Sequence, residues 1–340
     1  MVRLAVVGVG WAGSRQVEAI AELGRKVEVD CLVDPDADFL REKSAQLGVT
    51  KTYTDFADVL ADATIDAVSL CSPHPFHCQQ ALQAAQAGKH VLVEKPMAMD
   101  VDEATAMIAA AQDNGVKLYV AESASYEPVA HFLRGLLQGG DYIGELVSAS
   151  LMKGFRAPQY SYPGRRAWLA EPDKGGKGTW TLHGIHTVGQ LRYILGEVET
   201  VYMAEHKGSA YQRTDVEGTM SGMMTLESGV QVSVVQTPEV KLYGDLGGYL
   251  LHGDNGSIRA GDAGCVIFND EHDGLRLEYP SAELSAYAQE IEAFADYIQA
   301  GVEGPTSGFM ERRSVAVVQA GYESTASGQA VHLKQRFGAL

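Results

Sequence analysis

The chain has 340 residues, and its 44 acidic and 27 basic side chains give a formal net charge of −17. Hydrophobic residues make up 46% and charged residues 21%, a balance that is typical of globular proteins and excludes collagen, a coiled coil or wholesale disorder. The acidity argues against a nucleic-acid partner, and the length suggests two domains at about 100–200 residues each.

The cysteines are typical of a reducing compartment, and the apolar pattern is that of a protein without a membrane span. Cys31, Cys71, Cys78 and Cys265 are scattered and form no CxxC pair. The first residues resemble a strand rather than a signal peptide, and no apolar run approaches the length of a membrane span. We therefore expect a cytoplasmic protein with no membrane partner.

The first third of the chain alternates strand-like and helix-like segments. Apolar runs predict strands at residues 4–7, 27–33, 67–71, 90–93 and 117–120. Helical periodicity predicts helices at 14–23, 36–47, 75–87 and 101–114. Apolar strands joined by helices are typical of a parallel sheet covered on both faces. Residues 1–122 are therefore predicted to form a doubly wound, Rossmann-type α/β domain that binds NAD.

The pattern changes after about residue 121. A helix at 128–138 precedes strand-like segments at 145–151, 198–205, 218–226, 230–236 and 248–252. Asn255-Gly256 predicts a hairpin turn, and helices are expected at 285–300 and 311–327. Residues 123–340 are therefore predicted to form an α+β domain with a large, mostly antiparallel open sheet.

A glycine motif follows the first strand. Gly8-Val9-Gly10-Trp11-Ala12-Gly13 has GxGxxG spacing and opens the first helix. The first glycine permits a tight turn, the second lets a pyrophosphate approach the backbone, and the third lets helix and strand pack closely. The helix N-terminus adds N–H donors, so the motif predicts a dinucleotide site.

Asp34 ends the second strand, 21 residues after Gly13. The expected offset of the acidic residue is about 20, and its carboxylate accepts hydrogen bonds from the ribose and repels a 2′-phosphate. The sequence therefore predicts NAD rather than NADP. A helix-capping role ahead of Pro35 is the alternative, and it is compatible with the ribose contact.

Three further motifs carry chemistry. Ser72-Pro73-His74-Pro75-Phe76-His77 and Glu94-Lys95-Pro96 follow strands, at the carboxyl ends where a doubly wound sheet binds ligands. The second domain contains Gly176-Lys177-Gly178-Thr179-Trp180-Thr181-Leu182-His183-Gly184-Ile185-His186. The pairs His74/His77 and His183/His186 have HxxH spacing, but their context does not favour metal ligation, and we expect no metal.

With these motifs, nearly the whole chain resembles the Gfo/Idh/MocA family, which includes glucose–fructose oxidoreductase and inositol dehydrogenase. The strand-turn at 249–258 and the segment 287–294 extend the resemblance. Members generally oxidise or reduce a secondary alcohol or hemiacetal of a sugar or cyclitol with a nicotinamide cofactor. The resemblance implies such a substrate and a homo-oligomer, a dimer or tetramer, formed through the open face of the second-domain sheet.

The resemblance also implies residue roles. Lys95 matches the lysine that contacts substrate hydroxyl and cofactor, and His186 matches the histidine that exchanges the hydroxyl proton. An ammonium stabilises a developing alkoxide, and histidine titrates near neutral pH, so both residue types suit the reaction. The predicted cofactor-binding residues are Gly8, Gly10, Trp11, Ala12, Gly13, Asp34, Ser72, Pro73, His74, His77, Glu94 and Lys95.

The chain departs from the family pattern near the catalytic histidine. Leu182 and Gly189 stand where the family has aspartates. His74 replaces an asparagine, and Ser125 replaces an arginine. His183 is the candidate replacement for the first missing aspartate, which makes it a third catalytic candidate. A packing or cofactor-shielding role for His183 is the alternative.

Substrate contacts are expected from aromatic and hydrogen-bonding side chains, because sugars stack on aromatic faces and form many hydrogen bonds. The candidates are Tyr126, Lys153, Tyr160, Arg165, Trp168, His183 and Tyr287. Plain surface roles are the alternative for the loop residues among them.

The motifs together favour an NAD-dependent oxidoreductase that transfers a hydride between a secondary hydroxyl of a sugar, sugar derivative or cyclitol and the nicotinamide. Two other functions remain open. A redox-neutral glycosidase would oxidise the sugar transiently and release an aglycone without net NADH. A non-catalytic sensor would bind NAD without turnover, although Lys95 and His186 argue against it.

Overall fold

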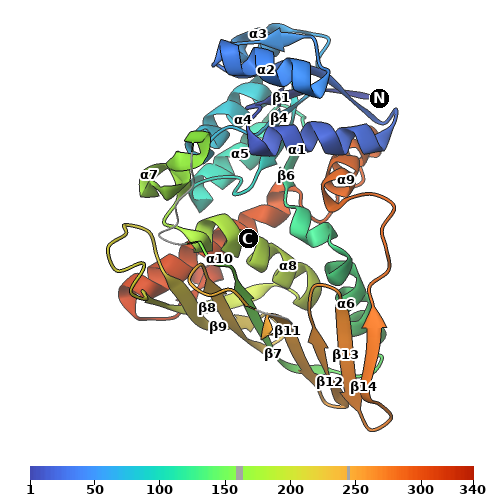
Figure 1. The fold of residues 1–340 in the computed structure, drawn as a ribbon, viewed down its shortest axis with the longest axis vertical. Coiled ribbons are helices and arrows are strands. Elements are labelled where there is room, and N and C mark those ends of the chain that lie inside the picture. The colour runs from blue at the N-terminus through green and yellow to red at the C-terminus, as the bar shows by residue number, and fades with distance from the viewer. Residues whose placement is uncertain (158–163, 243–245) are drawn as a thin grey trace. The chain divides into compact units, whose positions relative to one another are not determined.

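The computed structural model describes residues 1–157, 164–242 and 246–340, which divide into two compact units (Figure 1). The first contains residues 1–126 and 283–315, and the second contains residues 127–282 and 316–340. Residues 283–315 thus pack with the first unit although they follow most of the second in the sequence. The division into functional domains at 122/123 stays a prediction.

The first unit is built on a six-stranded parallel sheet in the order β3-β2-β1-β4-β5-β6. Its strands are β1 Val2–Val7, β2 Val27–Val33, β3 Thr52–Tyr53, β4 Ala67–Leu70, β5 His90–Glu94 and β6 Leu118–Ala121. The order reverses between β1 and β4, the point at which ligands bind in such sheets. The predicted Rossmann fold is confirmed. β3 was not predicted, because two residues carry no periodicity.

Helices join these strands and complete the first core. They are α1 Trp11–Ile20, α2 Ala37–Leu47, α3 Phe56–Ala61, α4 His77–Gln86, α5 Val101–Asp113 and, from the returning segment, α9 Ala286–Ala300. Asp36, Asp55 and Asp100 cap α2, α3 and α5 by accepting backbone N–H groups. Phe294 of α9 joins an apolar cluster that contains Leu92 of β5. A helix late in the sequence therefore supports the strands that carry the candidate site.

The second unit is built on a nine-stranded sheet in the order β14-β13-β12-β11-β7-β10-β9-β8-β15. Its strands are β7 Leu146–Gly154, β8 Val198–His206, β9 Thr219–Leu226, β10 Gln231–Thr237, β11 Gly248–Gly253, β12 Gly256–Ala260, β13 Gly264–Asn269, β14 Asp273–Glu278 and β15 Val331–His332. β7 and β10 pair in parallel and the other described pairs are antiparallel. The predicted sheet is confirmed, and β11 and β12 form the predicted hairpin.

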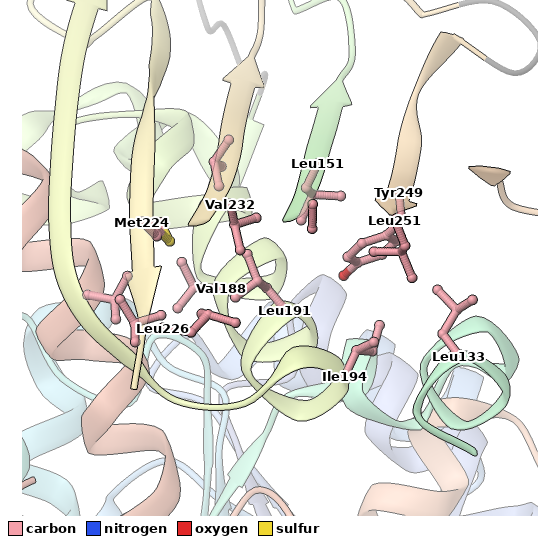
Figure 2. Packing of buried hydrophobic residues seen from close by; sticks show 14 of the residues in the cluster. Leu133, Leu151, Val188, Leu191, Ile194, Met224, Leu226, Val232, Tyr249 and Leu251 are labelled. Atoms are coloured by element: carbon pink, nitrogen blue, oxygen red, sulfur yellow. The ribbon is translucent and has the colours of Figure 1, made fainter. Parts of the chain in front are cut away.

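Helices cover one face of this sheet. The helices α6 Pro128–Gly139 and α8 Ile185–Leu195 pack on this face. The remaining helices of the chain are α7 Pro172–Gly175, α10 Gly308–Ser327 and α11 Leu333–Phe337. Figure 2 shows Val188, Leu191 and Ile194 of α8 beside Leu151 and Leu251 of the sheet. α8 is buried nearly all round, so it lacks the amphipathic period that predicts a helix from sequence.

Candidate active site

The loop between β1 and α1 forms a backbone cradle. Gly8 has φ +88°, and a Cβ there would lie 2.7 Å from the Cys71 carbonyl oxygen. A Cβ on Gly13 would lie 2.1 Å from the Gly8 carbonyl oxygen. By contrast, a Cβ on Gly10 would meet nothing within 4 Å, so the space beside Gly10 is open. α1 begins at Trp11, and its N-terminal N–H groups fit a pyrophosphate in that space.

Asp34 lies at the end of β2 and is only 3% exposed. Its Oδ2 accepts a hydrogen bond from the Val9 backbone N–H at 3.3 Å, and its Oδ1 accepts one from the Asp36 N–H at 3.1 Å. A carboxylate oxygen can accept more than one hydrogen bond, so Asp34 also fits a ribose hydroxyl. Arg41, the first cation after Asp34 in the chain, pairs with Asp38 at 2.8 Å.

His77 joins two loops of the candidate site. Its ring is fully buried, with Nδ1 3.0 Å from the Pro96 carbonyl oxygen and Nε2 2.8 Å from the Ser72 carbonyl oxygen. Burial lowers the pKa of His77, although both backbone contacts oppose this. His77 therefore holds the turn after β4 next to the turn after β5. Direct cofactor contacts of Ser72, Pro73, His74 and His77 stay predictions.

Lys95 follows β5 and lies within electrostatic range of three glutamates. Glu94 ends β5, whereas Glu122 follows β6 and Glu290 belongs to α9, and the latter two are fully buried. Gln16 of α1 donates its side-chain amide to Glu94 at 3.2 Å and to Glu290 at 3.5 Å. Four segments that are distant in sequence thus place carboxyl and amide groups around the predicted catalytic lysine.

Burial governs the protonation of the three glutamates around Lys95. It raises the pKa of Glu122 to about 7 and the pKa of Glu290 well above its ordinary value. It also raises the pKa of Glu94, whereas the charge of Lys95 lowers all three pKa values and does not cancel the effect of burial. Three carboxylates around one ammonium would leave excess buried negative charge. The group therefore retains protons to higher pH than exposed glutamates do.

Two residues that were predicted to contact the substrate lie beside these glutamates. Tyr126 ends the 3₁₀ turn Ser123–Tyr126, and its hydroxyl is 2.6 Å from the Tyr119 hydroxyl. Tyr287 lies in the first turn of α9, within electrostatic range of Glu94 and Glu290. Burial raises the pKa of both Tyr126 and Tyr287, so both remain neutral phenols. Their contact with substrate stays a prediction.

In the second unit, the predicted catalytic histidines lie on an unusual turn. Residues Trp180–Gly184 form a π-helix that runs directly into α8, with His183 in the former and His186 in the latter. Trp180 is completely buried and donates its indole N–H to the Val318 carbonyl oxygen at 3.1 Å. A Cβ on Gly184 would lie 2.5 Å from Trp180 Cε3, so this position requires glycine. π-Helical turns occur frequently at functional sites.

Glu217 anchors the beginning of this turn. Its carboxylate is 5% exposed and accepts hydrogen bonds from the Trp180 backbone N–H and from the Tyr322 hydroxyl, the latter at 3.3 Å. Gly178 has φ +143°, and a Cβ there would lie 2.4 Å from Glu217 Oε2. Burial raises the pKa of Glu217 to about 7. The glycine at 178 thus lets a buried carboxylate reach the backbone that leads to His183.

The position of the missing family aspartate is apolar. Leu182 packs in a cluster with Leu169, Tyr211 and Val216. The ring of His183 instead lies against that of Phe155, with centroids 4.4 Å apart. That His183 takes over the role of the aspartate stays a prediction.

The remaining substrate candidates are spread over the same unit. Lys153 is partly buried at the end of β7, Trp168 packs against the Leu182 cluster, and Arg165 is exposed in the 3₁₀ segment Gly164–Ala170. Tyr160 lies outside the described residues. Contact of Lys153, Arg165 and Trp168 with substrate stays a prediction.

Sequence reasoning missed Gln16, Glu122, Glu290 and Glu217. Glu290 had a usable signal, because it shares the inward face of α9 with the buried residues Ile291 and Phe294. Glu217 had none, because it precedes β9 in a loop and its partners Trp180 and Tyr322 are remote in sequence.

Residues 1–157, 164–242 and 246–340 contain no group of three or more His, Cys, Asp or Glu side chains arranged to hold a metal ion. Within the same ranges, every helix is too short or too polar to cross a membrane.

Comparison with known proteins assigns the chain to a family. Residues 2–122 match an oxidoreductase family with an NAD-binding Rossmann fold, and residues 132–259 match the GFO/IDH/MocA C-terminal domain. D-xylose 1-dehydrogenase (NADP(+)) 2 of Haloferax volcanii is 28% identical over 298 residues, which cover 85% of this chain and 86% of the relative. Inositol 2-dehydrogenase 3 of Saccharopolyspora erythraea is 22% identical over 99% of this chain and 97% of the relative.

Solved structures show the same fold. A levoglucosan dehydrogenase in complex with NADH and levoglucosan matches with a TM-score of 0.86 and 19% identity, covering 98% of this chain and 99% of that chain. The fold, the glycine motif and the two family models agree along most of the sequence. The chain belongs to the Gfo/Idh/MocA family of NAD(P)-binding oxidoreductases.

Proposed function

We propose that this protein is an NAD-dependent dehydrogenase that acts on a secondary hydroxyl of a sugar, sugar derivative or cyclitol. The observation that carries the proposal is the placement of Lys95 at the carboxyl end of a Rossmann strand, within electrostatic range of carboxyl groups from three segments. The names of relatives, which include D-xylose, inositol and D-apiose dehydrogenases, support the substrate class.

NAD is proposed over NADP because of Asp34. Its fixed carboxylate disfavours a 2′-phosphate, and the first cation after it pairs with Asp38. One relative is named for NADP, so cofactor choice varies among the relatives.

NAD, held by the glycine loop after β1 and by Asp34, would supply the acceptor for the hydride that leaves the substrate carbon. The ammonium of Lys95 holds the substrate hydroxyl and stabilises negative charge on its oxygen as the proton leaves. His186 takes that proton, and it returns the proton in the reverse direction. His183 supports the hydrogen bonding of this proton transfer. Glu94, Glu122 and Glu290 lie within electrostatic range of Lys95 and favour its charged form when they are ionised.

The test is turnover with NAD and a panel of aldoses, uronates, inositols and aryl glycosides. NADH absorbance and aglycone release are read together, in the wild type and in Lys95→Ala. Removing one stabilising donor typically costs about 100- to 1,000-fold in kcat, and we expect a loss of that size. Lys43→Ala, which removes a lysine from α2, is the control for loss of a positive charge and should retain activity.

Each outcome separates the candidates. NADH formation that Lys95→Ala abolishes supports the dehydrogenase. Aglycone release without net NADH would identify a redox-neutral glycosidase. NAD binding without either signal over the whole panel would favour a non-catalytic sensor.

We also propose a cytoplasmic homo-oligomer, a dimer or tetramer that uses the open face of the nine-stranded sheet. The four cysteines are free thiols, which suits a reducing compartment. Exposed apolar side chains on the sheet, including Tyr202, Met223 and Leu250, support the interface.

A further inference from the structure

We propose that the substrate carries an anionic group, a carboxylate or a phosphate, and that Lys153 binds it. This inference rests on the proposed function, because it assumes that the second unit holds the substrate near His183. It narrows the substrate class from polyols in general to sugar acids or sugar phosphates.

Lys153 extends from β7 on the face of the sheet that the helices cover. Leu151 points to the helix-covered face of the sheet, beside α8 (Figure 2). Side chains two residues apart share a face, so Lys153 lies on that face, at the end of β7. Gln236 of β10 is its register partner and accepts a hydrogen bond from Thr187 of α8 at 2.8 Å.

The segment that carries the predicted catalytic histidines lies close to the end of β7. Phe155 is two residues beyond Lys153, and its ring contacts that of His183. Thr187, which donates a hydrogen bond to Gln236 beside Lys153, directly follows His186. Lys153 therefore lies on the surface that also receives the helix turn carrying both histidines.

Lys153 has no counter-charge in the described part of the chain. The residue is partly buried, and within the described ranges its ammonium makes no hydrogen bond or ion pair. Glu239, two residues beyond the end of β10, is engaged by Thr219, whose backbone N–H and hydroxyl donate to it at 3.1 and 3.2 Å. A lysine ammonium without a protein partner is available to an anionic ligand, and a charge-assisted hydrogen bond to that ligand is stronger than a neutral one.

The local charge supports the same conclusion. Counted from the sequence, residues 153–177 contain six cationic and two acidic side chains, in a chain whose net charge is −17. This segment connects the end of β7 to the turn before the histidines. A positive segment in an acidic protein attracts anions selectively to one place on the molecule.

The experiment compares kcat/KM for matched substrates that differ in one group. D-Glucose, D-glucuronate and D-glucose 6-phosphate form the first set, and D-galactose with D-galacturonate form the second. We expect one anionic type to exceed its neutral partner by about 10- to 100-fold, the range of a charge-assisted hydrogen bond. Lys153→Gln should remove most of that preference, so that kcat/KM for the anionic sugar falls toward the value for its neutral partner.

Lys174→Gln is the matched control. It removes the same charge from the same segment, but Lys174 is exposed and already pairs with Glu171. The Lys174→Gln variant should keep the preference for the anionic substrate. Equal use of neutral and anionic sugars, or an equal loss on both in Lys153→Gln, would overturn the inference while leaving the dehydrogenase intact.

A binding measurement separates this inference from the proposed function. If no substrate yields NADH, calorimetry with glucuronate and glucose 6-phosphate on the NADH-saturated protein decides the question. Binding that is lost in Lys153→Gln and kept in Lys174→Gln supports the anion site even though the proposed reaction has failed. Absence of binding in the wild type overturns it.

Discussion

Burial, rather than a charged partner, determines the behaviour of Glu217. Its pKa is raised from 4.5 to about 7, chiefly by desolvation and further by Glu205, while the hydrogen bonds from Trp180 and Tyr322 oppose the shift. At a pH between these two pKa values, Glu217 is therefore protonated in the folded state and ionised in the unfolded chain. Over that interval the free energy of unfolding falls as pH rises.

This shift makes a prediction for Glu217→Gln. Glutamine cannot ionise, so the free energy of unfolding of the variant should not fall with pH on account of this residue. In the wild type, Glu217 should lower that free energy by on the order of 3 kcal/mol between pH 4.5 and 8. Urea unfolding at several pH values measures the difference from the wild type. Glu227→Gln removes an exposed carboxylate and is the control. A constant difference between Glu217→Gln and wild type across pH would contradict the raised pKa.

Asp34 makes a prediction about cofactor choice. Asp34→Asn keeps an oxygen that can accept from Val9 but removes the charge that faces a 2′-phosphate. We expect kcat/KM with NAD to fall by about tenfold and the NAD:NADP ratio to move toward NADP. Steady-state kinetics with both cofactors measure the ratio. Asp36→Asn removes a neighbouring charge and retains a good N-cap, so it should leave the ratio unchanged.

At the scale of elements, the π-helix shows why a glycine-rich segment stands before the histidines. Gly178 admits the Glu217 carboxylate, and Gly184 admits the Trp180 ring. Each glycine removes a collision with one specific buried group. The sequence motif is therefore a packing requirement as well as a signature of the family.

This reading predicts opposite effects for two glycine-to-alanine changes. Gly178→Ala should lower the free energy of unfolding by about 2 kcal/mol or more, because φ is positive and the methyl group would overlap a carboxylate. Gly135→Ala lies within α6, where a Cβ meets nothing within 4 Å, and should raise it by about 0.5–1 kcal/mol. Denaturant unfolding measures both. Equal effects would contradict a specific role for Gly178.

The same elements show what could be predicted from sequence. The Rossmann strands were predictable because each is a short, nearly continuous apolar run between helices with polar faces. α8 was not predicted, because burial on all sides removes its period, and β3 was too short to detect. The glycine cradle and Asp34 could be placed by spacing alone. Glu122, Glu290 and Glu217 depend on tertiary neighbours, which spacing does not show.

For the whole molecule, the return of the chain is the feature that local patterns did not show. Residues 283–315 pack with the first unit, and α9 places Glu290 beside the group around Lys95. Helical periodicity predicted α9 itself but did not specify which sheet it covers. The candidate site of the first unit is therefore complete only when the late segment is present.

The open face of the nine-stranded sheet leads to the final prediction. Tyr202, Met223, Ser233, Ser150 and Leu250 follow one another across five adjacent strands. Tyr202, Met223 and Leu250 are 45%, 43% and 38% exposed. Exposed apolar residues interleaved with small ones suit a flat contact with a second copy of the sheet.

Met223→Asp should therefore convert the proposed oligomer to monomers, because a carboxylate at the centre of an apolar contact loses its hydration without gaining a partner. Size-exclusion chromatography with light scattering measures the mass at several protein concentrations. Val302→Asp is the control, since Val302 is 61% exposed and belongs to the first unit, not to this sheet. A monomeric wild type, or an unchanged mass in Met223→Asp, would exclude this face as the interface. Loss of the oligomer in both variants would show that added negative charge, rather than the sheet contact, drives dissociation.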